Sequence, residues 1–238
     1  RTFDINNPYP EESNRRIIAS LADIHCAPTS FAYDHLIKEG IQSDRIIVSG
    51  NTVVDAMQFV HQSIQNGLMQ VTDGVKHYLN TALSDEKKII LLTVHRRELA
   101  DEDVIAIFDA VVAILTRYND VVCVYPYHPN PRIVELLHNH PIARHNRVLL
   151  SEPFDYATMV YVLYAVHYVL TDSGGLQEEA TSLAKPVFIL RKTSERQEAI
   201  IAGNAYLVGT QPNCIIDIFG AVYASRNNHD SDICKIYG

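Results

Sequence analysis

The strongest constraint on the fold is an apolar run, KKIILLTVH from Lys87 to His95, which ends abruptly in charged residues. A strand that is apolar at nearly every position is buried on both faces of its sheet, as the strands of a parallel sheet are. Shorter apolar runs follow it, with helix-length segments between them. This alternation predicts an α/β fold with a doubly wound parallel sheet.

The hydrophobic pattern assigns the segments to strands and helices. We expect strands over residues 22–28, 45–50, 87–95, 121–125, 147–151, 167–170, 186–190 and 206–208. We expect helices over residues 13–21, 30–39, 52–65, 103–118, 131–139, 156–166, 175–183 and 215–224. Ser13 is the expected N-cap of the first helix. The polar stretch 66–86 is interpreted as a connector with one short helix.

The composition narrows the function classes. Hydrophobic residues make up 47% and charged residues 20% of the 238 residues, which is ordinary for a globular protein. The net charge of −8 leaves no basic excess for a phosphate backbone, so we expect no nucleic-acid partner. No apolar run reaches the roughly 20 residues that cross a bilayer, so we expect no membrane segment. The four cysteines lack zinc-ligand spacing, which predicts no metal site and reduced thiols in the cytoplasm.

Polar loops that follow strands are the places to look for a site, because ligands of parallel sheets bind at the carboxyl ends of strands. In TDSGG (171–175), the two glycines and Ser173 begin a helix, whose free N–H groups and dipole favour a phosphate. Glu179, and less so Glu178, are placed one turn later to accept hydrogen bonds from ribose hydroxyls. An ordinary turn capped by Asp172 or Ser173, with both glutamates solvated, fits the spacing equally well.

Three other loops carry polar residues after strands. In TVHRRE, His95 and Arg96 suit a phosphate or a proton transfer, or else the arginines pair with acidic residues of the next helix. In YPYHPNP, three prolines fix a rigid loop around His128, which on its own is more often structural than chemical. In RKTSERQEA, Arg196 belongs either to a site or to a surface ion-pair set.

The acidic pair Glu11 and Glu12 lies in PEESNRR near the start of the chain. Taken alone, two carboxylates at the first turn of a helix are explained by the helix dipole. The chain itself begins with Arg1 rather than Met, in a loop-like segment, which is typical of a cut end.

Eight motifs in this order resemble the non-hydrolysing bacterial UDP-N-acetylglucosamine 2-epimerases, from Arg1 to about Thr210: PEESNRR, DIHCAPTSFAYDHLIKEGI, IIVSGNTVVDAM, LLTVHRRE, YPYHPNP, EPFDYATMVYVL, LTDSGGLQEEATSLAKPV and TSERQEAIIAG. The family is built like GT-B glycosyltransferases, with two Rossmann-like domains that face a cleft. The resemblance implies that residues 1–65 are the end of a truncated first domain and its connection. Residues 66–238 then form the second, UDP-binding domain.

The resemblance also implies roles for single residues. Glu11 and His95 match catalytic residues of the family. Six positions match the UDP contacts, namely Ser173, Gly174 and Gly175 for the diphosphate, Glu179 for the ribose, the backbone near Phe154 for uracil, and Arg196. A second, activating UDP-GlcNAc site of the bacterial members is matched by Glu12, Arg96 and His128. The family uses no redox cofactor, and its members are usually dimers, so we expect a homodimer.

The family reaction interconverts UDP-GlcNAc and UDP-ManNAc by eliminating and re-adding UDP through 2-acetamidoglucal. The sequence departs from the family pattern at Val94, Leu99, Gln197 and Tyr206, and over NNHDSD at 227–232. With most of the first domain missing, we expect the chain to turn over poorly by itself. The alternatives are a fragment that binds UDP-sugars without turnover and a hydrolysing epimerase that releases ManNAc and UDP.

Overall fold

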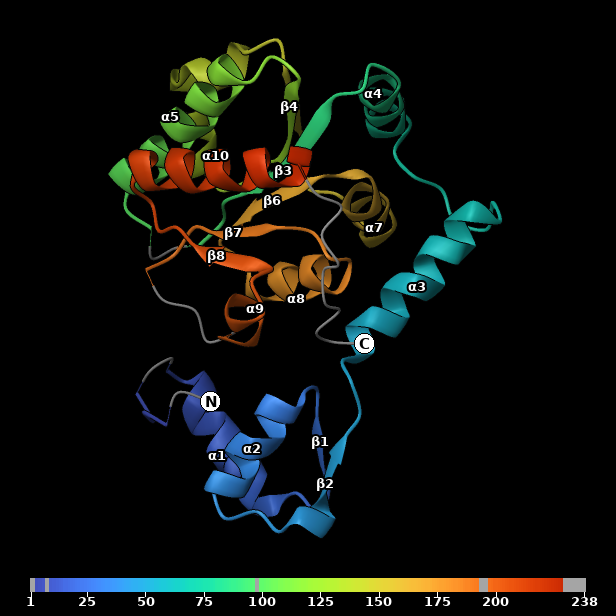
Figure 1. The fold of residues 1–238 in the computed structure, drawn as a ribbon, viewed down its shortest axis with the longest axis vertical. Helices are drawn as coiled ribbons and strands as arrows, with labels where there is room; N and C mark the ends of the chain where they lie inside the picture. Colours follow the sequence, from blue (N-terminus) through green and yellow to red (C-terminus); the bar gives the residue numbers. More distant parts are fainter. Residues whose placement is uncertain (1–2, 7–8, 97–98, 193–196, 229–238) are drawn as a thin grey trace.

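The computed structural model describes residues 3–6, 9–96, 99–192 and 197–228 of the chain. These residues form a small N-terminal unit and a larger unit built around a six-stranded sheet. Figure 1 shows the long helix α3 (Thr52–Gln65) running from the small unit to the large one. The two units are therefore joined both by a continuous helix and by the contacts described below.

The large unit contains one fully parallel sheet with the strand order β5-β4-β3-β6-β7-β8. Its strands are β3 (Lys88–Thr93), β4 (Val121–Pro126), β5 (Val148–Ser151), β6 (Tyr168–Thr171), β7 (Val187–Ile189) and β8 (Ala205–Leu207). Its helices are α4 (Asp73–Ser84), α5 (Asp101–Arg117), α6 (Pro131–Asn139), α7 (Tyr156–Ala165), α8 (Gly174–Ser182), α9 (Gln197–Ile201) and α10 (Pro212–Asn228), with a short 3₁₀ helix at Pro141–Arg144. The Rossmann-like parallel sheet that the sequence predicts is confirmed.

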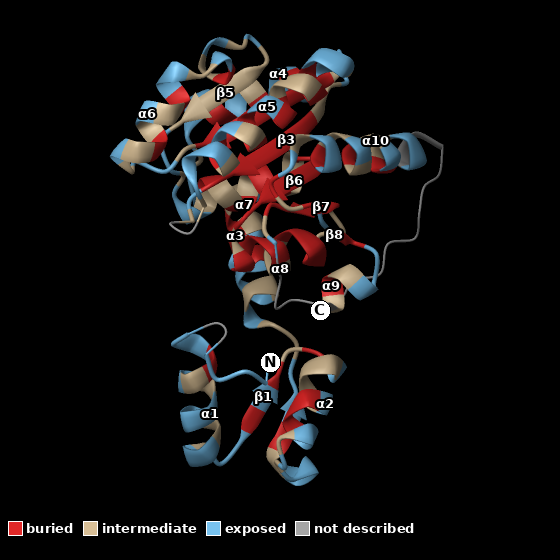
Figure 2. Ribbon diagram, turned by 90° about the vertical axis from the view of Figure 1, so that its left-hand side faces the viewer, coloured by how far each residue is buried: buried red, intermediate tan, exposed pale blue. Residues whose placement is uncertain are grey.

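Both faces of this sheet are covered, so its inner strands β3, β4, β6 and β7 are almost entirely buried and are drawn mainly in red in Figure 2. On one face the sheet packs against α5 and α10, where Phe108 and Phe219 are fully buried. On the other face it packs against α4, α7 and α8, where Leu79 and Leu163 are fully buried. A strand covered on both faces has no polar side to present, which explains the continuous apolar run at β3.

The small unit contains α1 (Glu11–Leu21), β1 (His25–Ala27), α2 (Ser30–Lys38), a 3₁₀ turn at Ser43–Arg45 and β2 (Ile46–Val48). The two strands pair in parallel to form a separate two-stranded sheet. Its buried apolar cluster is small, with Ala27, Leu36 and Ile46 as the fully enclosed members.

Local caps explain why several helices begin where the sequence predicts. Asn51 accepts a hydrogen bond from the Val53 amide at the start of α3, and Asn130 accepts one from the Arg132 amide at the start of α6. Both helices have the predicted bounds. Among the described residues, no helix is both long enough and apolar enough to cross a membrane.

One local prediction is wrong, one helix is longer than predicted, and one helix was not predicted. Ser13 is not an N-cap, because α1 already begins at Glu11 and the Ser13 hydroxyl donates to the Ile5 carbonyl at 2.8 Å. The connector 66–86 contains a helix of 12 residues, α4, whose apolar positions pack on the sheet. The short helix α9 was not predicted, since its five residues are too few to show a clear period.

Candidate functional site

The strongest candidate site lies where β3 and β6 end side by side. After β3, strands β4 and β5 extend the sheet toward one edge. The chain then crosses back, so that β6 lies on the other side of β3. Such a reversal of strand order is where doubly wound sheets bind ligands. Thr93 and Thr171 are register partners at the ends of these strands, and their hydroxyl oxygens form a hydrogen bond of 2.6 Å. The loops TVHRRE and TDSGG are thereby brought together.

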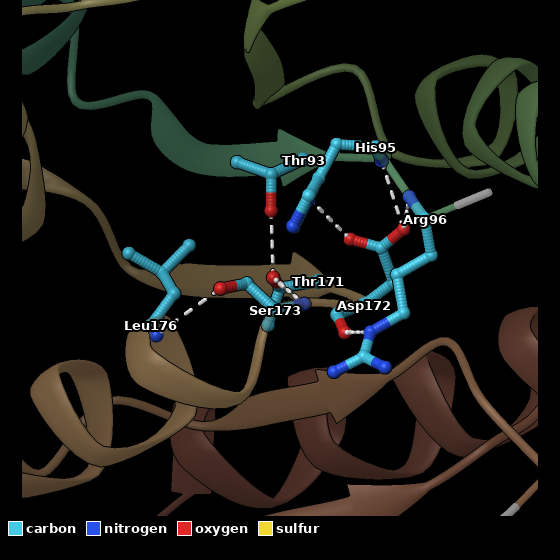
Figure 3. A network of polar contacts seen from close by, with 7 residues as sticks. All are labelled: Thr93, His95, Arg96, Thr171, Asp172, Ser173 and Leu176. Atoms are coloured by element: carbon cyan, nitrogen blue, oxygen red, sulfur yellow. Dashed lines mark hydrogen bonds and ion pairs between the residues drawn. The ribbon is translucent and has the colours of Figure 1, made fainter. Parts of the chain in front are cut away.

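A single buried carboxylate, that of Asp172, joins the two loops (Figure 3). One of its oxygens accepts hydrogen bonds from the backbone amides of His95 and Arg96, both at 2.8 Å. The other oxygen lies 2.7 Å from Nδ1 of His95. The Arg96 side chain in turn donates through Nε to the Asp172 carbonyl at 2.9 Å. Asp172 therefore fixes the backbone of His95 and lies within ion-pair distance of its ring.

This pairing has a chemical consequence for His95. A carboxylate next to Nδ1 favours a proton on that nitrogen, so the acid–base chemistry of the ring falls to Nε2. Orientation of a histidine by a carboxylate is a common arrangement where imidazole transfers protons or donates to an oxyanion. The sequence interpretation considered Asp172 only as a helix cap and missed this contact, because its partner lies 77 residues away.

The start of α8 forms the opposite side of the site. Ser173 is the N-cap, with its hydroxyl oxygen 3.5 Å from the Leu176 amide that donates to it, and its own amide donates to Thr171 Oγ1 at 2.9 Å. Gly174 and Gly175 occupy the first turn, and a side chain added at Gly175 would meet open space. The unobstructed amides and the positive end of the helix dipole suit an anion.

A cavity of about 330 Å³ lies between these loops. Among the predicted site residues, it brings together His95, His128, Phe154, Ser173, Gly175 and Glu179. Its remaining lining residues are mostly apolar, namely Thr93, Val94, Pro126, Pro153, Met159 and Leu176. An apolar cavity of this size with a few convergent polar groups is typical of a small-molecule site.

Glu179 is the acidic group of this cavity. Burial and, to a smaller extent, the charge of neighbouring Glu178 raise the pKa of the Glu179 carboxyl to about 7. Burial and then the Glu179 charge also raise the pKa of the nearby Tyr156 hydroxyl. At neutral pH the Glu179 carboxyl is thus partly protonated, and it can donate as well as accept hydrogen bonds. It is not the solvated glutamate of the alternative interpretation.

His128 lines the cavity from the proline-rich loop after β4. Its Nδ1 accepts from the Asn130 amide at 3.1 Å, which fixes the ring within the loop. The His128 and His95 rings lie 6.5 Å apart, centroid to centroid. The acidic residue Asp101 pairs with Arg132 rather than with Arg96.

The structure does not bring every predicted site residue to this cavity. Glu11 and Glu12 lie on α1 of the small unit, where Glu11 is exposed and Glu12 is fully buried with Arg15 Nη1 at 2.8 Å. Gly174 lies beside the cavity at the first position of α8. Arg196 lies outside the described residues. No group of three or more His, Cys, Asp or Glu side chains within the described ranges is arranged to hold a metal ion.

Comparison with known proteins places these features in context. A family model described as UDP-N-acetylglucosamine 2-epimerase matches residues 1–238. The UDP-N-acetylglucosamine 2-epimerase of Yersinia pestis is 40% identical over 217 residues, which cover 91% of this chain and 57% of that protein. The enzyme of the same name from Escherichia coli K12 is 36% identical over 231 residues, which cover 97% of this chain and 61% of that protein.

A solved structure agrees with this result. The UDP-GlcNAc 2-epimerase from Neisseria meningitidis bound to UDP-GlcNAc matches all of this chain with a TM-score of 0.84 and 36% identity. The match covers 64% of the Neisseria chain. The chain therefore spans about three fifths of the length of these relatives.

Proposed function

The chain belongs to the UDP-N-acetylglucosamine 2-epimerase family, and on that premise we propose that the cavity between β3 and β6 binds UDP. The observation that carries the proposal is the buried Asp172 carboxylate. It fixes the backbone of His95, whose side chain lines the cavity together with Ser173 and Gly175 at the start of α8. A donor-rich loop that faces a helix N-terminus is an arrangement suited to a diphosphate. We call this cavity the nucleotide cavity.

Within the nucleotide cavity the diphosphate is proposed to bind at Ser173, Gly174 and Gly175, with His95 as a further donor. Glu179 is proposed to bind the ribose hydroxyls, which is consistent with its half-buried position one turn into α8. The backbone near Phe154 is proposed to contact uracil, and Phe154 lines the same cavity. Arg196 is proposed as a further UDP contact, and only the resemblance of its motif to the family supports this proposal.

The proposed reaction is the interconversion of UDP-GlcNAc and UDP-ManNAc. A base removes the proton from C2 of the sugar while the C1–O bond breaks and UDP leaves with the bonding electrons. A proton is then returned to the opposite face of C2 of the 2-acetamidoglucal, and UDP re-adds at C1. His95 beside the diphosphate is placed to stabilise the departing charge, which supports its catalytic role. Glu11 is proposed as a proton-transfer residue, and no redox cofactor is required.

We further propose that residues 1–65 and 66–238 belong to two domains of a GT-B-like enzyme. The separate small sheet before residue 52 and the large sheet after residue 87 support that division.

Glu12, Arg96 and His128 are proposed contributors to a second, activating UDP-GlcNAc site. A homodimer and a cytoplasmic location stay predictions. Because the chain spans about 57% of its Yersinia relative, we propose that it turns over poorly by itself.

Calorimetric titration with UDP tests the nucleotide cavity. We expect His95→Ala and Glu179→Ala each to weaken UDP binding about tenfold or more, since each removes a polar contact to the ligand. Glu135→Ala, an exposed glutamate on α6, is the matched control and should bind as the unaltered chain does. Unchanged affinity in both cavity variants would remove these residues from the site.

Proton NMR tests the reaction itself. Incubation with UDP-GlcNAc in D₂O should give slow deuterium incorporation at C2 and UDP-ManNAc as the product. Free ManNAc would instead show a hydrolysing epimerase. Binding of UDP without any exchange at C2 would support the alternative, a UDP-sugar-binding fragment.

A further inference from the structure

Helix α8 separates two cavities. Glu179 lines the nucleotide cavity, whereas the preceding residue, Glu178, lines a second cavity of about 490 Å³. That second cavity lies between the units, since its other walls come from α1, β1 and α2, together with Glu198 of α9. Successive residues of a helix point about 100° apart, so the two carboxylates face different sides. A small rotation of the first turns of α8 would therefore move both.

Glu178 is bound by a residue far away in the sequence. Asn51 Nδ2 donates a hydrogen bond to Glu178 Oε2 at 2.8 Å, between residues 127 positions apart. The same Asn51 side chain caps α3, because its Oδ1 accepts from the Val53 amide at 3.1 Å. One amide group thus uses its acceptor to begin α3 and its donor to contact α8.

Asn51 lies at the junction of the two units. It follows Gly50, whose φ of +74° turns the chain between β2 and α3. Helix α3 itself packs against α7 and α8 of the large unit. A similar contact lies nearby, where the Thr29 hydroxyl, the N-cap of α2, donates to Glu198 at 3.3 Å. The N-cap residues of two helices therefore connect the small unit and its linker to carboxylates of the large unit.

We propose that Asn51 is a positioning residue for the nucleotide cavity. By binding Glu178 it fixes the rotation of α8, so that Glu179 faces the cavity and the N-terminal unit is linked to nucleotide binding. The inference rests on the proposed UDP site and adds the residue that orients its ribose-binding carboxylate. Neither Asn51 nor Glu178 needs to touch the nucleotide for this effect.

The two functions of the Asn51 amide can be separated by substitution. In Asn51→Asp the acceptor that caps α3 is retained, but the donor to Glu178 is replaced by a like charge. In Glu178→Gln the side-chain oxygen still accepts from Asn51. In the double variant, the amide introduced at position 178 can donate to the carboxylate introduced at position 51, which restores a hydrogen bond with its direction reversed.

The experiment compares these three variants with the unaltered chain and with Asp55→Asn, which changes an acidic residue of the same helix. UDP affinity is measured by calorimetry at pH 8, and hydrogen exchange of the α8 amides is measured without ligand. We expect Asn51→Asp to bind UDP about fivefold more weakly and to exchange faster in α8. Glu178→Gln, the double variant and Asp55→Asn should all bind within about twofold of the unaltered chain.

The outcomes distinguish this inference from the proposed function. Unchanged affinity and exchange in Asn51→Asp would overturn the positioning role. A double variant as impaired as Asn51→Asp would also overturn it, because the defect would then not come from the lost hydrogen bond. If the unaltered chain fails to bind UDP while exchange in α8 follows the expected pattern, the UDP site is wrong and the positioning of α8 by Asn51 stands.

Discussion

The two units of the molecule share a strand–helix pattern but differ sharply in how much they bury. In the large unit, apolar side chains from six strands are enclosed on both faces by helices. In the small unit, two strands and two helices enclose only a few apolar side chains. Several large apolar residues of the small unit are exposed, namely Ile17, Ile18, Leu21, Ile24, Ile47 and Val48. Figure 2 shows this contrast as the difference between red and pale blue.

The contrast shows that an alternation of strands and helices does not by itself produce a stable hydrophobic core. A two-stranded sheet is marginal by itself, because each strand has one unpaired edge and too little covered surface. The six-stranded sheet encloses its central strands completely, and this rigid centre is where β3 and β6 present the candidate site. The small unit depends instead on its contacts to the large one, such as those of Asn51 and Thr29.

The largest expected effect is in the core of the large unit. Phe108→Ala should lower the free energy of unfolding by about 3–5 kcal/mol, because a fully buried ring on α5 is replaced by a cavity. Chemical denaturation followed by circular dichroism measures this change. A loss of less than about 1 kcal/mol would show that this face of the sheet is not a close-packed core.

The next largest effect is expected at Asp172, which joins the two loops of the candidate site. Asp172→Asn leaves a single acceptor oxygen and no charge, so the side chain can accept from the amides of His95 and Arg96 or from Nδ1 of the His95 ring, but not from both. We expect a stability loss of about 2–3 kcal/mol, since buried donors lose a charged acceptor. UDP binding should weaken about tenfold or more.

The matched control for this prediction is Asp155→Asn, at the N-cap of α7. Asp155 accepts from the Thr158 amide at 2.7 Å, so that position tests the loss of an ordinary capping carboxylate. Its stability loss should stay below about 1 kcal/mol. Equal losses of stability and of UDP affinity at the two positions would contradict a special role for Asp172.

A smaller effect is the pH dependence that arises from Glu179. Its pKa is about 7 in the folded protein and near 4.5 in the unfolded chain, so the folded state binds more protons between these values. The contribution of Glu179 to stability is therefore fully present below pH 4.5 and falls as the pH rises to 7. Because the carboxyl is partly exposed, we expect this contribution to change by only about 1 kcal/mol.

Denaturation at pH 5 and pH 7.5 measures this contribution as the difference between the unaltered chain and Glu179→Gln. The comparison is needed because burial lowers the pKa values of His61 and His145, whose contributions change in the opposite direction with pH. Parallel pH profiles for the two proteins would show that the Glu179 carboxyl is not perturbed.

The smallest effect is expected in the small unit. Leu36→Ala on α2 should change the unfolding of the large unit by less than about 0.5 kcal/mol, because Leu36 packs only within a minor cluster. Hydrogen exchange in α2 and β1 should nevertheless accelerate, since local opening there is less costly. A loss as large as that of Phe108→Ala would show that the two units unfold as one.

Much of the fold was predictable because its signals are local. Helices α3 and α6 have the predicted bounds, since Asn51, and Asn130 followed by Pro131, mark their starts. The positions of Ser173 and His95 after strands predicted a site at these loops, and both line the cavity. Helix α4 was underestimated because its polar sequence conceals a narrow apolar face formed by Val75, Leu79 and Ala82.

The sequence by itself determined which segments become buried strands, which become helices and which polar loops follow them. These features depend on periodicity and capping, which act over a few residues. Tertiary structure alone decided that β3 and β6 are neighbours, that Asp172 fixes His95, and that Asn51 reaches Glu178. The reason is physical: strand order, burial and pairing bring together residues 77 to 127 positions apart, and no local pattern encodes such contacts.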